Sequence, residues 1–173
     1  MKKQSIYSLL AISLSALAFG QVAIGKENIE GNSTLLDFNN TTNNTLGIIL
    51  PAVDVMPSDF TTANNGTFLF DKSSSTLKMY ENNQWVNLSK EAGDGSAIVS
   101  NTTDDVGKGA IIGSETTNAQ GVLVLESTDK AMILPRIKAP HLNVKSPYPG
   151  MMCYDTETQS VALFDGRFWN YWR

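Results

Sequence analysis

Side chains that carry out catalysis or bind metals are scarce in this sequence of 173 residues, which holds one cysteine, Cys153, and one histidine, His141. A lone cysteine cannot form an internal disulfide, so a fold of this size must be stabilised by its hydrophobic core. Zinc sites are built from several Cys and His side chains. We therefore expect no metal, no cofactor and no enzymatic activity, and we expect the Cys153 thiol to be buried in a strand.

Positive charge is scarce as well. The chain has 13 Lys and Arg residues against 17 Asp and Glu residues, which gives a net charge of −4. Nucleic acids and anionic membrane surfaces attract proteins with clusters of Lys and Arg. The charge balance therefore argues against nucleic acid and against membrane surfaces as partners.

Long apolar runs are absent after the first twenty residues. There, a basic start precedes an apolar stretch at 6–19, and small residues stand before Gln21. This is the pattern of an export signal, which we assign to residues 1–20. A transmembrane helix would need ~20 strongly apolar residues, and serines dilute this shorter run. We expect an exported protein, located in the extracellular space, at the cell surface or in the periplasm, without membrane insertion after signal cleavage.

The sequence after this signal shows no helical spacing of apolar residues, and it repeats itself instead. Residues 48–88, shifted by 84 positions, fall on 132–172 without a gap. Apolar, turn and aromatic positions agree along the whole overlap. Identical pairs include Ile49 with Ile133, Pro51 with Pro135, Gly66 with Gly150, Asp71 with Asp155 and Trp85 with Trp169.

Each repeat predicts a front part with short strands, followed by a three-stranded β-meander. Apolar strands separated by Asn, Asp and Gly turns are typical of β-hairpins. The first front part carries about three extra residues in the polar turn 39–44, where insertions cost little. The predicted meander strands are 67–70, 77–80 and 85–88 in the first repeat, and 151–154, 161–164 and 168–172 in the second.

The chain is therefore interpreted as all-β, with two copies of a β-meander repeat at 21–89 and 110–173. A stretch rich in Gly, Ser, Asp and Thr at 90–109 is interpreted as a flexible linker, with room for one short strand at 97–100. The short strands at the end of each front part should stop at a proline, which cannot donate to a β-ladder. In the connection that follows in the first repeat, one helical turn at 58–60 is compatible with the sequence.

Three features imitate functional motifs. The stretch 20–26 resembles a phosphate-binding loop, but Glu27 replaces the hydroxyl residue that would bind magnesium, and no helical pattern follows. His141 lies in a proline-punctuated connection without the nucleophile elbow of a hydrolase. Asp71 and Asp155 each follow a strand at a turn, where Asp caps the local backbone. We interpret all three features as structural.

Aromatic residues crowd the C-terminus and supply the candidate contact site. Strand alternation places Trp169 and Tyr171 on one face of the last strand, and Phe168 and Trp172 on the other. Because Trp169 repeats Trp85, these two residues are interpreted as structural. Phe168, Tyr171 and Trp172 are the candidate residues for contact with a ligand or partner, and plain packing or subunit contact is the alternative.

Three segments of the second repeat resemble a pattern of secreted surface proteins of Bacteroidota-type bacteria and of tail-fibre-like phage proteins: LPR at 134–136, PGMMCYD at 149–155 and FDGRFW at 164–169. The openings at 24–25 and 36–38 also look like those of such proteins. The resemblance covers nearly the whole chain after the signal and implies a structural or adhesive β-unit. The first repeat departs from it, with Ala52 in place of the Arg and Asn82-Asn83 in place of the Asp-Gly.

The resemblance carries over no catalytic residue, and the unpaired edges of a meander favour assembly. We expect a non-enzymatic exported protein with a structural, adhesive or assembly role, whose partner is a second copy of itself or another surface protein. The alternative is a small carbohydrate-binding module that stacks a glycan on the C-terminal aromatic residues. A secreted hydrolase with an unrecognised site is a third hypothesis.

Overall fold

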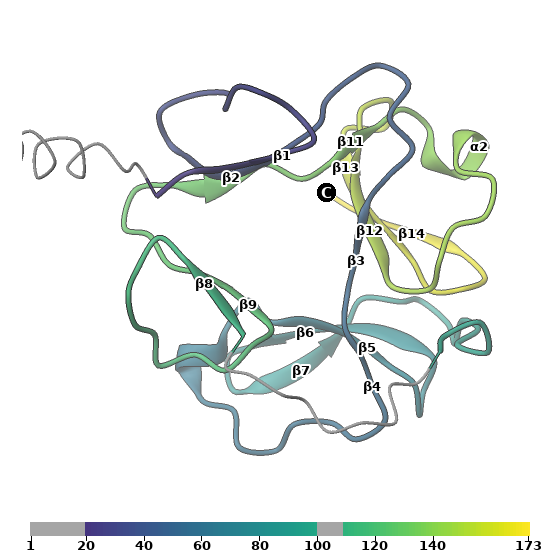
Figure 1. Cartoon of the computed structure of the whole chain (residues 1–173). Coiled ribbons are helices and arrows are strands. Elements are labelled where there is room, and N and C mark those ends of the chain that lie inside the picture. Colours follow the sequence, from purple (N-terminus) through teal and green to yellow (C-terminus); the bar gives the residue numbers. More distant parts are fainter. Residues whose placement is uncertain (1–19, 100–108) are drawn as a thin grey trace, which may run out of the picture.

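The computed structural model describes residues 20–99 and 109–173, and nearly all regular structure in them is β-strand (Figure 1). The all-β prediction is confirmed. The predicted signal peptide, apart from Gly20, and the middle of the predicted linker lie outside the described residues. The helical elements within those two ranges are single turns, and none has the length and apolarity needed to cross a membrane.

The strands of both repeats follow the same order along the chain. In the first repeat they are β1 (Val22–Ile24), β2 (Thr34–Phe38), β3 (Ile48–Ile49), β4 (Ala52–Val53), β5 (Phe68–Asp71), β6 (Thr76–Glu81) and β7 (Gln84–Asn87), with the 3₁₀ turn η1 (Thr62–Asn64) before β5. In the second they are β8 (Ala110–Ile112), β9 (Leu123–Leu125), β10 (Ala131–Met132), β11 (Arg136–Ile137), β12 (Met151–Asp155), β13 (Ser160–Phe164) and β14 (Trp169–Trp172), with the helical turn α2 (Pro140–Asn143) before β12. The six predicted meander strands are confirmed to within about one residue.

Strand pairing repeats with the same offset as the sequence. Phe70 is opposite Leu77 in the antiparallel ladder of β5 and β6, and Tyr154 is opposite Val161 in that of β12 and β13. Both partners differ by 84 positions between the repeats, and the ladders of the outer meander strands agree in the same way. The predicted correspondence of the two meanders is therefore confirmed.

A fourth strand, which the sequence did not predict, joins each meander. β4 pairs parallel with β5, and β11 pairs parallel with β12. β3 ends two residues before Pro51 and β10 ends three residues before Pro135, earlier than predicted, and the proline carbonyls accept hydrogen bonds. Phe70 N donates to Pro51 O at 2.9 Å, and Tyr154 N donates to Pro135 O at 2.8 Å. Because proline lacks only the donor, the ladder begins at the proline itself.

Two smaller predictions are wrong. The helical turn expected at 58–60 lies instead at η1, where Ala63 N donates to the Thr61 hydroxyl (3.3 Å) and Thr61 N donates to the Asn64 side chain (3.0 Å). This capping box fixes the start of the turn at Thr61. The short strand allowed at 97–100 is absent from its described residues, which follow a turn typical of their Gly- and Ser-rich surroundings.

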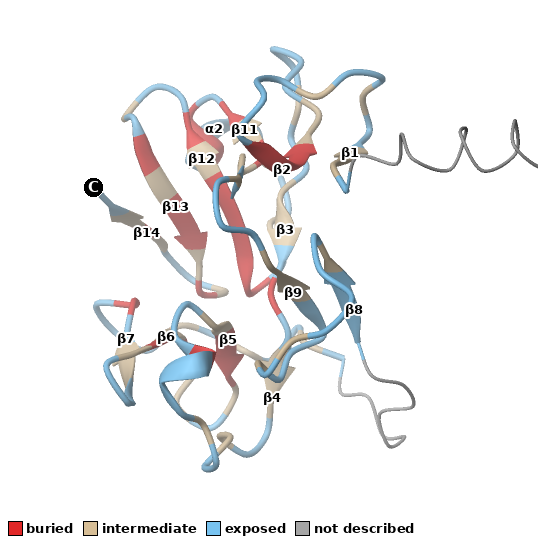
Figure 2. Ribbon diagram, turned by 90° about the vertical axis from the view of Figure 1, so that its left-hand side faces the viewer, coloured by how far each residue is buried: buried red, intermediate tan, exposed pale blue. Residues whose placement is uncertain are grey.

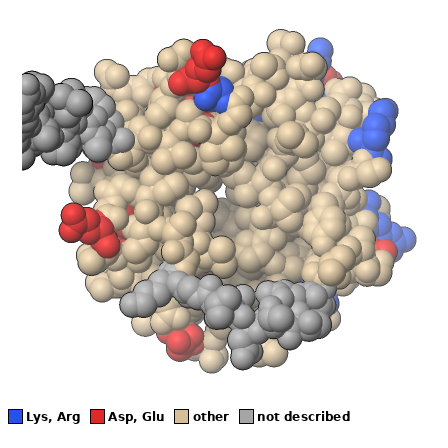
Figure 3. Space-filling model, viewed as in Figure 1, with Lys and Arg blue, Asp and Glu red and all other residues tan. Residues whose placement is uncertain are grey.

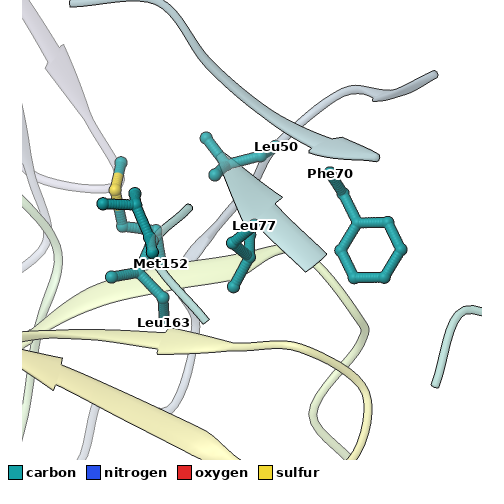
Figure 4. Packing of buried hydrophobic residues seen from close by; sticks show 6 residues of the cluster. Leu50, Phe70, Leu77, Met152 and Leu163 are labelled. Atoms are coloured by element: carbon teal, nitrogen blue, oxygen red, sulfur yellow. The ribbon is translucent and has the colours of Figure 1, made fainter. Parts of the chain in front are cut away.

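The two repeats interleave. β3 of the first repeat pairs antiparallel with β12 of the second, and β10 of the second pairs parallel with β2 of the first. Figure 2 shows β2 and β12 almost wholly buried and β8 largely exposed. The main core draws on both repeats, with Leu50, Phe70, Leu77 and Leu88 from the first and Met152 and Leu163 from the second (Figure 4). The two repeats therefore pack on each other and share one core.

Candidate functional site

The C-terminal strand β14 has one face in a core and one face partly open, as strand alternation predicts. Trp169 and Tyr171 pack against a second core cluster formed by Ile137, Met151, Cys153 and Ala162. Phe168, just before β14, and Trp172, at its end, are each 44% exposed. Of the three candidate contact residues, Phe168 and Trp172 therefore present accessible surface, and Tyr171 contributes mainly to packing.

Tyr171 ties α2 to the meander sheet. Its hydroxyl lies 3.1 Å from Nδ1 of His141, and the two rings meet edge to face with centroids 6.4 Å apart. Burial, together with the charge of Asp155, raises the pKa of Tyr171 to about 12. The phenol is therefore neutral at ordinary pH, and the contact between His141 and Tyr171 holds the helical turn to the sheet.

Trp172 connects the two repeats. Its indole Nε1 donates to the backbone carbonyl of Leu88 at 2.9 Å, while the ring stays partly accessible. Phe168 carries the guanidinium of Arg167 over its ring, at 5.2 Å from the centroid. The two exposed rings belong to residues four positions apart in the sequence, and Asn170 between them is buried. They do not form one continuous stacking surface.

The turn at Asp165 and Gly166 receives residues of the predicted linker. Asp165 Oδ1 accepts from Phe168 N at 2.7 Å, and its carbonyl accepts from Asp94 N at 2.9 Å. Gly166 has φ of 94°, and a Cβ there would lie only 1.7 Å from the Asp94 carbonyl oxygen. Residue 166 must therefore be glycine both for its conformation and for this close approach. Asn170 extends the junction, because its side-chain oxygen accepts from Lys90 N at 3.1 Å.

The repeated acids Asp71 and Asp155 cap the first turn of their meanders, as the sequence predicts. Asp71 Oδ1 accepts from Ser73 N at 2.9 Å, and Asp155 Oδ1 accepts from Glu157 N at the same distance. Each carboxylate also accepts a hydroxyl three residues later, from Ser74 at 2.6 Å and from a threonine at 2.8 Å. Both acids are buried, and their oxygens accept hydrogen bonds from backbone and hydroxyl groups of the turn.

The two acids differ in one further partner. Lys78 Nζ lies 3.0 Å from Asp71, whereas Asp155 accepts from Ala139 N at 3.0 Å. Burial alone would raise the pKa of Asp71, but the hydrogen bonds from Ser73, Ser74 and Lys78 hold it far below its usual range. The pKa of Asp155 is lowered too, since its hydrogen bonds outweigh burial.

The stretch that imitates a phosphate-binding loop is occupied by protein groups. Lys26 Nζ binds Asp37 Oδ2 at 2.7 Å, and Glu30 N donates to the same oxygen at 2.9 Å. Bends, and no helix, follow Lys26. The structural interpretation of this stretch is confirmed.

The Cys153 thiol is buried as predicted, and burial, followed by the charge of Asp155, raises its pKa to about 12. No group of three His, Cys, Asp or Glu side chains gathers as metal ligands in residues 20–99 and 109–173.

A pocket of about 400 Å³ lies where the front parts meet, lined by Leu35, Gly113 and the turn at 126–130. Figure 3 shows acidic and basic groups at the periphery of the face and an uncharged middle.

Sequence reasoning missed two polar partnerships in the interior, those of Asp37 with Lys26 and of Asn170 with Asp165. Both have a signal in the repeat. Asp37 aligns with Val124, and Asn170 aligns with Val86. A polar residue at a position that is apolar in the other repeat could have marked each of them.

Comparison with protein families gives one match. Residues 111–173 match the family described as a phage tail like trimerisation region. The match begins in β8 and runs to the last residue, so it covers the second repeat. Comparisons with curated proteins and with solved structures give no match. The family match supports the resemblance to tail-fibre-like proteins, while the bacterial group stays a prediction.

Proposed function

We propose that this chain is an exported, non-enzymatic β-repeat protein that builds a structural assembly at the cell surface or in the extracellular space. The observation that carries the proposal is the exchange of strands between the repeats, β3 onto β12 and β10 onto β2. A unit that binds its own kind through backbone ladders is suited to assembly, and the match of the second repeat to a trimerisation region agrees with this.

The test is the mass of the secreted protein in solution. Sedimentation velocity over a wide concentration range should give a species of several chains, and N-terminal sequencing should find Gln21 first. A protein that stays monomeric at high concentration would remove the support for an assembly role. Retention of Met1 in the exported protein would contradict the proposed signal.

A carbohydrate-binding role is the second candidate, and the partial exposure of Phe168 and Trp172 favours it. A glycan array probed with the secreted protein separates the two. Binding that is lost in Phe168→Ala and Trp172→Ala, in a protein that is a monomer, would support the glycan role in place of assembly.

A further inference from the structure

The strand exchange between the repeats runs in one direction. The front strand of the first repeat, β2, receives β10 of the second repeat along its free edge, with Leu36 opposite Met132. The crossing strand of the first repeat, β3, adds to the edge of β12, with Ile48 opposite Met152. Both contacts relate a strand of the first repeat to a later strand of the second.

The reciprocal contacts are missing among the described residues. β9, which repeats β2, pairs only with β8, and β5, which repeats β12, pairs only with β4 and β6. The edge of β5 that corresponds to the β3 site begins at Phe68 and has no strand partner within the described ranges. Likewise β3 and β10 each use one edge and leave the other without a described partner.

Burial follows this difference at the front strands. Leu35 and Leu36 of β2 are 3% and 0% exposed, whereas their equivalents Val122 and Leu123 are 68% and 48% exposed. All four of these side chains are aliphatic, so the difference in exposure does not come from the residue type. An apolar strand that is covered in the first repeat and exposed in the second indicates a binding site for a further strand.

The entrance to the meander shows the same difference. A Cβ added to Gly150 would lie 3.3 Å from the carbonyl oxygen of Leu50, and Leu50 N donates to the Gly150 carbonyl at 2.9 Å. Gly66, its equivalent, has a similar φ of 87° and is exposed, and no atom of the described part of the chain lies within 4 Å of such a Cβ. Phe68 is only half-buried, whereas its equivalent Met152 is fully buried. The first meander therefore has the geometry of the second without the strand that covers it.

We propose that a second copy of this chain fills these edges, so that β9 of one copy pairs with β3 of the next while β10 of the first pairs with the Phe68 edge of β5. This deepens the proposed assembly function and rests on it. Replacing each residue of the internal contacts by its equivalent in the other repeat gives the register. Leu36 opposite Met132 becomes Leu123 opposite Ile48, and Met152 opposite Ile48 becomes Phe68 opposite Met132.

The occupant follows from continuity with the contacts inside the chain. Each open edge has an internal equivalent that is filled by a strand of this same sequence, and the donor strands β3 and β10 have one edge to spare. The contact is heterologous, because different surfaces of the two copies meet. Such contacts close into a ring or continue as a filament.

Disulfide trapping tests the register. The variants Leu123→Cys and Ile48→Cys are purified separately, mixed, oxidised and separated without reductant. The only native cysteine, Cys153, is buried and does not compete. We expect a covalent dimer from this mixture and none from a control mixture of Leu142→Cys with Ile48→Cys, because Leu142 is exposed on α2, which lies on the other side of the molecule from β8 and β9 (Figure 1).

Charge on the open strand provides a second test. Leu123→Lys should weaken self-association at least about tenfold in sedimentation, because a lysine on an edge strand blocks strand addition. Leu142→Lys is the matched control, and the melting temperature of both variants should stay near that of the wild type. If the wild type associates but Leu123→Lys has no effect and no disulfide forms, the proposed edges are wrong while the assembly function stands. A monomeric wild type would overturn both.

Discussion

Trp172 and Leu88 stand 84 positions apart and touch, because the indole Nε1 of Trp172 donates to the Leu88 carbonyl at 2.9 Å. The two residues are equivalent in the two repeats. A residue in contact with its own equivalent marks a place where the two repeats meet. The aromatic side chain at the last strand is therefore part of the junction between the repeats, in addition to the surface that it exposes.

Removing this hydrogen bond should destabilise the junction. Trp172→Phe keeps an aromatic ring but leaves the carbonyl of the buried Leu88 without its donor, and we expect a loss of about 1 kcal/mol in the free energy of unfolding. Phe168→Leu is the matched control, because Phe168 has the same exposure and its contacts with Arg167 and Asp165 lie within the second repeat. Urea denaturation measures both variants. Equal losses would mean that the hydrogen bond contributes nothing specific.

Local features of the fold could be predicted from the sequence because local chemistry determines them. Asp165-Gly166 and the apolar alternation around it located the last hairpin, and the recurrence of Asp71 located the capped turn in both repeats. The parallel pairing after Pro51 was not predicted, because the partner of a two-residue strand is set by tertiary packing. The proline signalled only where the preceding strand ends.

The candidate site could be predicted in part. Alternation along β14 separated Phe168 and Trp172 from Trp169 and Tyr171, but which of the two faces is open depends on contacts between residues far apart in sequence. The hydrogen bond of Trp172 to Leu88 and the docking of Asp94 on Asp165 are contacts of this kind. No local pattern of residues specifies which strand edge receives which strand.

The repeated tryptophans should both stabilise the fold, and Trp85 should do so more. Trp85 packs on Tyr80 and Phe60 with ring centroids 5.1 and 5.3 Å apart, and its Nε1 donates to the Pro57 carbonyl at 3.3 Å. Among the described residues, Trp169 has one aromatic ring contact, with Phe164 on the neighbouring strand β13 at 5.3 Å between centroids. We expect losses of about 3 kcal/mol for Trp85→Ala and about 2 kcal/mol for Trp169→Ala, measured by urea denaturation. Unchanged stability in both would mean that the repeat is not the folding unit.

Acid should destabilise the protein through its capping aspartates. The pKa values of Asp71 and Asp155 are lowered in the folded state, so the unfolded state binds protons more readily in acid. Their stabilising effect is present above the unfolded pKa, near 3.8, and is lost as the pH falls through and below that value. Melting temperatures measured between pH 7 and pH 2 should therefore fall steeply at the acid end.

The two acids can be separated through Lys78, which contacts Asp71 and has the uncharged equivalent Ala162. Lys78→Met should raise the pKa of Asp71 toward its usual value and make stability less dependent on pH below about pH 4. Lys130→Met is the control, because Lys130 pairs only with the exposed Asp129 among the described ion pairs. A pH profile altered equally by both substitutions would contradict the role assigned to Lys78.

Removing only Lys26 from its ion pair with Asp37 should cost more free energy of unfolding than replacing both residues with apolar ones. The Asp37 side chain is 1% exposed and that of Lys26 is 12% exposed, and Asp37 Oδ1 has no hydrogen-bond partner among residues 20–99 and 109–173. Lys26→Met leaves a buried carboxylate without its cation, so we expect a loss of about 3 kcal/mol. The double variant Lys26→Met with Asp37→Val, which copies the residue at the equivalent position 124, should lose less than the single variant because no unpaired charge remains. Urea denaturation of the wild type and the two variants measures these losses. A double variant less stable than Lys26→Met would contradict this prediction, because it would mean that the ion pair itself stabilises the front part of the first repeat.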